Sequence, residues 1–331
     1  MSDRCDKCPE SVVRGYEYCT SCGRPLGARK KDGLREAIKV FGITLMFLCA
    51  GMLFLEVYAI LWGFGETWNG LYGVYIFILT PAPTVIGTLY GTAAKLYYLF
   101  IVISAIASFI VLLYMSRGGL KDILRGKTED VNNVPLYSIA TLFAAVISFN
   151  VILNVFLTAS GNPPSAPIHV GPEWGRWFSY LVASVWEEVI CRILMIGLPM
   201  VLLGLMLGEK GSWKRLFGRF NLDGAAAAFI IISAVLFSYA HLAEWDVFKL
   251  IPTFISGLAL GYLFVKYGIY ASIMLHLLVN YMSSVIWVFG DGAESIVSLF
   301  MFAALFLGVI FFIQYAVRAS RFVKNLLSGT Q

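Results

Sequence analysis

The sequence predicts an all-α polytopic membrane protein with about eight transmembrane helices and a small Cys-rich domain ahead of them. Of its 331 residues, 59% are hydrophobic and only 14% are charged, and the mean hydropathy is +0.78. Soluble domains average about 25% charged residues, so this chain has too little polar surface for a water-exposed globule. Apolar runs of roughly 18 residues or more, long enough to cross the hydrocarbon core, recur from Ile38 to Gln314.

The N-terminal cysteines predict a metal site. Four of the six cysteines lie within the first 22 residues, as Cys5 and Cys8 and then Cys19 and Cys22. Two CxxC pairs can close tetrahedrally around one Zn²⁺. We expect a short hairpin between the pairs, and therefore a zinc-ribbon-like domain over residues 1–27 that folds only with its structural zinc. The alternative, two disulfides, needs an oxidising compartment. The ribbon is also a candidate binding surface for a cytosolic protein.

Eight transmembrane spans are expected, over residues 38–62, 96–116, 136–159, 177–207, 224–243, 247–266, 269–289 and 295–317. The segment 70–94 is left out because Pro81, Pro83 and nearby glycines argue against a regular helix, so we expect a loop or a re-entrant piece there. Residues 28–135 would then form a linker and the first two spans. Residues 136–331 would form a helical core with a C-terminal span and a basic tail.

The basic residues predict the orientation in the membrane. With eight spans, most of them fall in loops and tails on one side: Arg24, Arg29, Lys30, Lys31, Arg35, Lys39, Arg117, Lys121, Arg125, Lys127, Lys210, Lys214, Arg215, Arg219, Lys266, Arg318, Arg321 and Lys324. The positive-inside rule places that side, and both termini, in the cytosol of a multi-pass protein of the cell membrane. The lipid bilayer is the expected partner of these charges, and nucleic acid is not.

Three spans contain polar or ionisable side chains: Glu187, Glu188 and Arg192 in the fourth, His241 in the fifth, and His276 and Asn280 in the seventh. A charge at mid-bilayer costs about 2.5–3.5 kcal/mol, so these residues are candidates for a functional site. The set resembles a hydrolytic site, with a carboxylate or imidazole as general base and imidazole or amide donors for an oxyanion. Structural ties between helices and a proton or transport path are the alternatives.

Helical spacing suggests how these side chains pair. Glu188 and Arg192 are four residues apart with the acid first, which is the favourable order for an ion pair within a helix. Glu187 is turned about 100° away from Glu188. His276 and Asn280 are also four residues apart and share one face. Glu56 is expected at the membrane interface, and Asn150 is expected to bond a neighbouring helix.

The order EExxxR (Glu187, Glu188, Arg192), FxxxH (Phe237, His241) and HxxxN (His276, Asn280) resembles the CPBP family. This family includes CAAX prenyl endopeptidases of the Rce1 type and bacteriocin-processing and abortive-infection-like membrane proteins. The stretch 254–276 is also similar to family members, and the resemblance covers about 177–285. The ribbon and the first span lie outside it.

The resemblance implies an intramembrane glutamate-type endopeptidase whose substrate is a membrane-associated protein or peptide, such as a prenylated CAAX protein. Glu187 and His241 would activate water, His276 and Asn280 would stabilise the oxyanion, and Glu188 and Arg192 would support the site. It implies no metal in the catalytic site. Two alternatives remain: a non-catalytic membrane scaffold, and a zinc metalloprotease with Glu187, His241 and His276 as ligands. His241 and His276 fall near opposite ends of their spans, so we expect tilt or a break at Gly197–Pro199 to bring them together.

Overall fold

The computed structural model describes Cys5 and residues 8–13, 18–23, 33–79, 83–164, 171–243 and 246–328. It divides into two compact units, residues 1–41 and 42–331. The basic residues Arg24, Arg29, Lys30 and Lys31 lie outside the described residues. The boundaries predicted at residues 27 and 135 stay a prediction.

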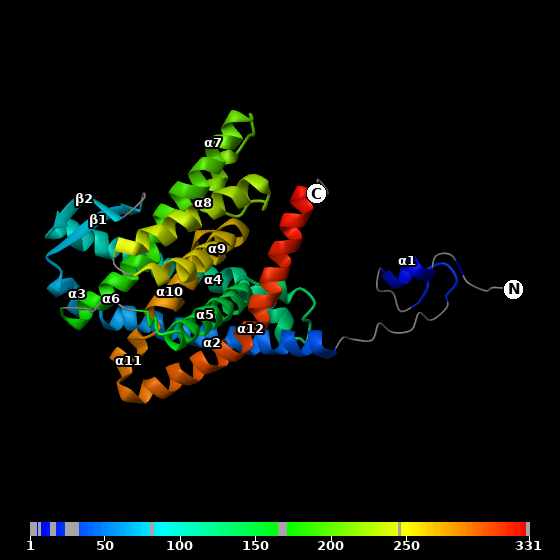
Figure 1. Cartoon of the computed structure of the whole chain (residues 1–331), viewed down its shortest axis with the longest axis horizontal. Helices are drawn as coiled ribbons and strands as arrows, with labels where there is room; N and C mark the ends of the chain where they lie inside the picture. Colours follow the sequence, from blue (N-terminus) through cyan, green and yellow to red (C-terminus); the bar gives the residue numbers. More distant parts are fainter. Residues whose placement is uncertain are drawn as a thin grey trace. The chain divides into compact units, whose positions relative to one another are not determined.

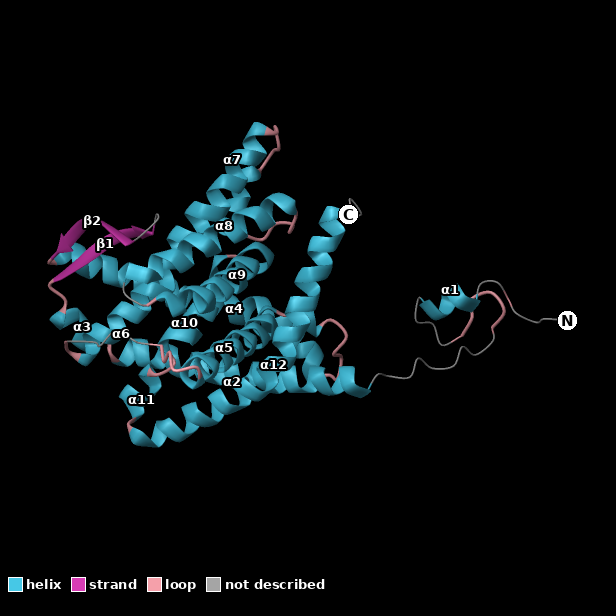
Figure 2. Ribbon diagram, in the orientation of Figure 1, coloured by secondary structure: helices cyan, strands magenta, loops and turns pink. Residues whose placement is uncertain are grey.

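Helices dominate both units (Figures 1 and 2). The first unit holds α1 (Cys8–Val13), and α2 (Gly33–Trp62) runs from it into the second. The second unit continues with α3 (Phe64–Gly70), β1 (Gly73–Leu79), β2 (Pro83–Tyr90), α4 (Thr92–Leu124), η1 (Val131–Asn133), α5 (Pro135–Ala159), α6 (Glu173–Val182), η2 (Ala183–Glu187), η3 (Val189–Gly197), α7 (Leu198–Met206), η4 (Ser212–Phe217), α8 (Gly224–Ala240), η5 (His241–Ala243), η6 (Val247–Lys249), α9 (Leu250–Tyr267), α10 (Ile269–Tyr281), α11 (Ser284–Phe289) and α12 (Asp291–Leu327).

All eight predicted spans are helical, which confirms the all-α polytopic class. Among the described residues, six helical runs are long and apolar enough to cross a membrane: α2, α4, α5, Glu173–Met206, Val247–Tyr267 and α12. The other two are shorter than predicted. Helix α8 has 17 residues, and the span 269–289 consists of α10, with 13 residues, and α11.

The segment 70–94 is not a membrane helix, as predicted, but the expected loop is a β-hairpin. Strands β1 and β2 pair antiparallel, with Phe77 opposite Val85 and a shift of register between Ile76 and Phe77. The hairpin lies at one edge of the helical unit (Figure 1). Val, Ile, Tyr, Phe and Thr favour strands, and the prolines and glycines that exclude a helix do not exclude a hairpin. Residues 80–82, between the strands, lie outside the described residues.

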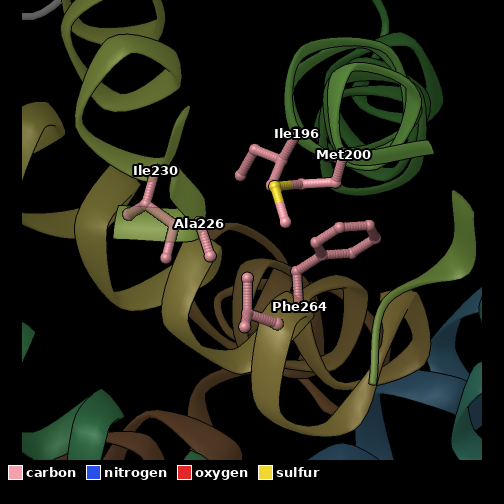
Figure 3. Close-up of a cluster of buried hydrophobic side chains, with 6 residues drawn as sticks. Ile196, Met200, Ala226, Ile230 and Phe264 are labelled. Atoms are coloured by element: carbon pink, nitrogen blue, oxygen red, sulfur yellow. The ribbon is translucent and has the colours of Figure 1, made fainter. Parts of the chain in front are cut away.

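A buried apolar cluster joins the helical run 173–206 to α8 and α9. It consists of Ile196, Met200, Ala226, Ile230, Phe264 and Val265 (Figure 3). Two glycines allow the close approach of α8 and α9. A Cβ atom at Gly257 would lie 3.0 Å from Cα of Ala234, and one at Gly261 would lie 2.9 Å from a methyl group of Ile230. Gly257 and Gly261 therefore act as a small-xxx-small contact, and this contact positions the end of α8, from which His241 follows.

Helix α5 lies at the centre of the helices that surround the site. Every residue from Pro135 to Ser148 is buried, and the helix packs against α4, α9, α10 and α12. Helix α5 is also hydrogen-bonded to α12, because Ser148 Oγ donates to the carbonyl oxygen of Leu305 at 2.7 Å. Helix α5 is therefore a core helix on all sides over its first half, as its unbroken apolar sequence suggests.

Glu56 should destabilise the fold. The prediction that it lies at the interface is wrong: its side chain is fully buried in α2, and neither oxygen has a hydrogen-bond partner among the described residues. Burying a polar group without such a partner costs about 1–3 kcal/mol. We therefore expect Glu56→Leu to raise the midpoint of thermal unfolding in detergent. Glu66→Leu, at an exposed position of α3, is the control and should not raise it. A lower midpoint for Glu56→Leu would contradict this reasoning.

Candidate functional site

The two adjacent acids lie in an irregular part of one continuous helical run. Between α6 and α7 the backbone is π-helical over Ala183–Glu187 and again over Val189–Gly197. Glu187 ends the first π segment, and Glu188 separates the two. Wide π turns of this kind often occur at functional sites. The break expected at Gly197–Pro199 is absent from this described stretch, since η3 continues directly into α7; the irregularity lies upstream of it.

Glu188 and Arg192 form a fully buried ion pair. Arg192 Nε donates to Glu188 Oε2 at 3.0 Å, and both side chains have 0% exposure. Arg192 Nη1 donates to Ser233 Oγ of α8 at 2.9 Å, and this hydroxyl donates to the carbonyl oxygen of Cys191 at 2.7 Å. The predicted pairing within the helix is confirmed, and it extends to a second helix.

His276 of α10 lies between the two carboxylates. Its Nδ1 is 2.9 Å from Glu188 Oε1, and its Nε2 is 3.8 Å from Glu187 Oε2. An ionised carboxylate only accepts hydrogen bonds, so Nδ1 carries the proton in this contact. The Nε2 side of the ring is then turned toward Glu187. The gap of 3.8 Å exceeds a direct hydrogen bond.

His241 is held in a defined tautomer. Its Nδ1 lies 2.7 Å from the carbonyl oxygen of Phe237, one helical turn earlier. Because a carbonyl oxygen only accepts, Nδ1 must be the donor, and in the neutral ring Nε2 keeps its lone pair. The ring of Phe237 packs edge-to-face against both imidazoles, with centroids 4.7 Å from His241 and 6.0 Å from His276. Phe237 therefore positions both histidines.

A single cavity of about 760 Å³ contains most of the predicted site. Its wall includes Glu187 of η2, His241 of η5, and both His276 and Asn280 of α10. Glu188 and Arg192 do not line it, and they lie behind the wall with 0% exposure. The structure thus brings all six predicted residues into one region, as four cavity residues and a buried pair.

Other residues of the wall escaped the sequence analysis. Asn150 of α5 lines the cavity instead of bonding a neighbouring helix, and its Oδ1 has no hydrogen-bond partner within the described part of the chain. Arg176 and Lys249 also line the cavity, and Lys249 interacts electrostatically with Glu187. Both appear in the sequence only as isolated charges near the ends of spans, which are common in membrane proteins.

The N-terminal cysteines form a second candidate site. All four sulfur atoms lie within 4.8 Å of one another, with 3.8 Å between Sγ of Cys5 and Cys19 and 3.7 Å between Sγ of Cys8 and Cys22. Sulfurs placed about 2.3 Å from a tetrahedral Zn²⁺ are roughly 3.8 Å apart, and all four cysteines are free thiols. The hairpin expected between the pairs is wrong over residues 8–13, which form α1. Its start at Cys-Pro-Glu favours a helix N-terminus.

The surroundings of the cluster favour a thiolate at Cys19 and a protonated thiol at Cys8. The backbone N–H groups of Ser21 and Cys22 lower the pKa of Cys19 to about 6. Loss of solvation, followed by hydrogen bonds to neighbouring sulfurs, raises the pKa of Cys8 to about 12. Four adjacent thiols cannot all ionise without a cation between them. The donor set therefore fits a single metal ion.

A comparison with protein families identifies the central part of the chain. Residues 170–282 match the model of a family described as type II CAAX prenyl endopeptidase Rce1-like. This segment is therefore similar to the Rce1-like family. It covers about a third of the chain and contains all six predicted site residues, which confirms the resemblance. The cysteine cluster, the hairpin and α5 lie outside it. Comparisons with curated proteins and with solved structures gave no match.

The membrane class follows from two findings together. Residues 170–282 are similar to a family described as type II CAAX prenyl endopeptidase Rce1-like, and six helical runs of the described residues have the length and composition of membrane spans. The protein is therefore a multi-pass membrane protein, as predicted.

The buried pair should contribute mainly to stability. We expect Glu188→Gln to lower the midpoint of thermal unfolding, because removing one partner of a buried pair costs about 3–5 kcal/mol. Glu187→Gln is the matched control, since Glu187 lies on the cavity wall and retains 13% exposure. It should change the midpoint much less. A Glu188→Gln protein as stable as wild type would show that Arg192 does not need this partner.

Proposed function

We propose that the protein is an intramembrane endopeptidase that uses Glu187 and His241 to activate water. The observation that supports this most is the convergence of Glu187, His241, His276 and Asn280 on one cavity. The match of this segment to the Rce1-like family supports the reaction class. Placing an acid, two imidazoles and an amide inside apolar helices costs stability, which a purely structural role does not require.

The first step is attack by water on the peptide carbonyl. Nε2 of neutral His241 can accept a hydrogen bond from the water, because Nδ1 is bonded to the carbonyl oxygen of Phe237. Glu187 takes the proton as the oxygen–carbon bond forms. The carbonyl π electrons move to oxygen and leave a tetrahedral oxyanion.

The second step needs donors for the oxyanion and a proton for the leaving amine. His276 carries a proton on Nδ1 toward Glu188, which keeps the ring oriented into the cavity. With a second proton on Nε2 the His276 ring is an imidazolium between the two carboxylates, and its Nε2–H group and the Asn280 amide would donate to the oxyanion. The proton held by Glu187 then passes to the amine nitrogen as the carbon–nitrogen bond breaks.

The substrate is a membrane-associated protein or peptide, with a prenylated CAAX-type tail as the first class to test. The distribution of basic residues supports cytosolic termini in the cell membrane. In that orientation the cysteine cluster would hold its zinc on the cytosolic side. The surface of this zinc-bound domain would then be available to bind a cytosolic protein.

Activity should depend on Glu187. We expect Glu187→Ala, purified with the full chain, to lose about 10²–10⁴-fold of its activity on a farnesylated peptide library, because the general base is removed. Glu294→Ala, at an exposed position of α12, should keep full activity. Product formation followed by mass spectrometry measures both. If wild type and Glu187→Ala are equally inert on every peptide class tested, the protein is a membrane scaffold and not an enzyme.

Zinc content should distinguish a protein that binds zinc only at the N-terminal cysteines from one that also binds zinc at Glu187, His241 and His276. We expect one zinc per full-length chain by elemental analysis, lost in Cys19→Ser/Cys22→Ser because half of the ligands are removed. A chain that begins at Gly33 should insert in the membrane without zinc.

His241→Ala is the informative control for the same measurement. Ring N–H bonds to carbonyls and carboxylates are also common among zinc-binding histidines, so geometry alone does not decide. A zinc that survives truncation and is lost in His241→Ala would make the core a metalloprotease.

A further inference from the structure

One wall of the catalytic cavity comes from outside the Rce1-like segment. Strands β1 and β2 contribute six residues to the wall: Gly73, Val74, Tyr75, Phe77, Pro83 and Val85. The same cavity holds Glu187, His241, His276 and Asn280. A substrate bound at these groups therefore also meets the hairpin.

One face of the hairpin is turned toward the cavity. Side chains alternate along a strand, so Tyr75 and Phe77 lie on the same face of β1. Val85 is directly opposite Phe77 in the antiparallel register and shares that face. All three residues line the cavity. We call Tyr75, Phe77 and Val85 the hairpin wall.

The hairpin wall is tied to the residue next to Glu187. The indole Nε1 of Trp186 donates to the carbonyl oxygen of Phe77 at 2.9 Å. The Trp186 ring is itself held edge-to-face against Tyr97 of α4, with centroids 5.6 Å apart. Strand β1 also packs against η3, which carries Arg192, and against α8, which carries Phe237. Phe77 therefore has a defined position relative to the reacting groups.

The chemistry of the hairpin wall selects apolar groups. Residues 73–90 contain no charged side chain, and on the other side Leu260 and Val279 line the same cavity. Consecutive residues of an extended peptide are about 3.3–3.4 Å apart. When the scissile peptide bond of the substrate lies at Glu187, the side chain of the next substrate residue reaches β1. This is the strand whose Phe77 carbonyl oxygen is bonded to Trp186. Tyr75, Phe77 and Val85 carry no charge, so a charged side chain packed against them would lose hydration without gaining an ionic partner from the hairpin wall.

We propose that the hairpin wall is the specificity-determining subsite of the enzyme, and that it takes a bulky apolar side chain adjacent to the scissile bond. The inference rests on the proposed endopeptidase function and assigns part of its substrate preference to residues 75, 77 and 85. It predicts that chains with the same six site residues but a different hairpin differ in substrate choice.

The test compares two neighbouring residues of β2. Val85 is 56% exposed and lines the cavity, whereas Ile86 is 60% exposed and does not. The full chain is assayed with a pair of farnesylated peptides that carry Leu or Ala after the modified cysteine. We expect Val85→Ala, which removes two methyl groups, to lower kcat/KM for the Leu peptide by about tenfold, and Phe77→Ala, which removes a whole ring, to lower it at least as much. Activity on the Ala peptide should fall much less, so that the Leu-to-Ala ratio drops, and Ile86→Ala should leave this ratio unchanged.

A second measurement does not depend on a truncated side chain. A benzophenone amino acid placed at position 85 of the Glu187→Gln chain should crosslink to the Leu peptide, and the same group at position 86 should not. Equal labelling at both positions, or an unchanged Leu-to-Ala ratio in Val85→Ala, overturns the subsite and leaves the protease intact. A wild-type chain that cleaves no peptide overturns the proposed function, and the subsite with it.

Discussion

The buried carboxylate of Glu188 is the group on which the rest of the site depends. One oxygen accepts from Arg192 on the same helical run, and the other lies 2.9 Å from Nδ1 of His276 on α10. Arg192 in turn reaches Ser233 on α8. An ionised group taken out of water costs several kcal/mol unless its partners are all in place. The fold is therefore stable only when these three segments have one relative position.

This constraint explains how two adjacent acids can have different roles. Glu188 has 0% exposure and is saturated by cationic or N–H partners, whereas Glu187, one residue earlier, reaches the cavity wall with 13% exposure. The two carboxylates differ in exposure and in hydrogen-bond partners, and such differences in environment give paired carboxylates distinct roles in other proteins. The π-helical backbone on both sides of Glu188 adds a local distortion at this point. A regular α-helix would also turn Glu187 about 100° from Glu188, but it would change how the following turns meet α8 and α10.

The parts of this arrangement that follow local periodicity could be predicted from the sequence. The pairing of Glu188 with Arg192 follows from four-residue spacing, and the cysteine cluster follows from two CxxC pairs. The contact of Glu188 with His276 joins residues 88 positions apart, and no local rule specifies it. The same holds for Glu56, whose burial depends on neighbouring helices, and for Asn150, which the sequence cannot assign to a cavity or to a helix contact. The prolines and glycines of residues 70–94 exclude a regular helix, but they do not by themselves distinguish a loop from a hairpin.

In the proposed function, reaction chemistry and substrate choice fall in different parts of the chain. The six site residues all fall within 170–282, so a family match indicates the chemistry that the cavity can perform. Asn150 and the hairpin lie before that segment, yet they line the same cavity. Their positions are set by long-range packing, through the burial of α5 and the bond from Trp186 to Phe77. Side chains of the hairpin can change without disturbing the Glu188 network, because none of its partners is in the hairpin. The hairpin part of the cavity wall can therefore differ while the Glu188 network stays in place.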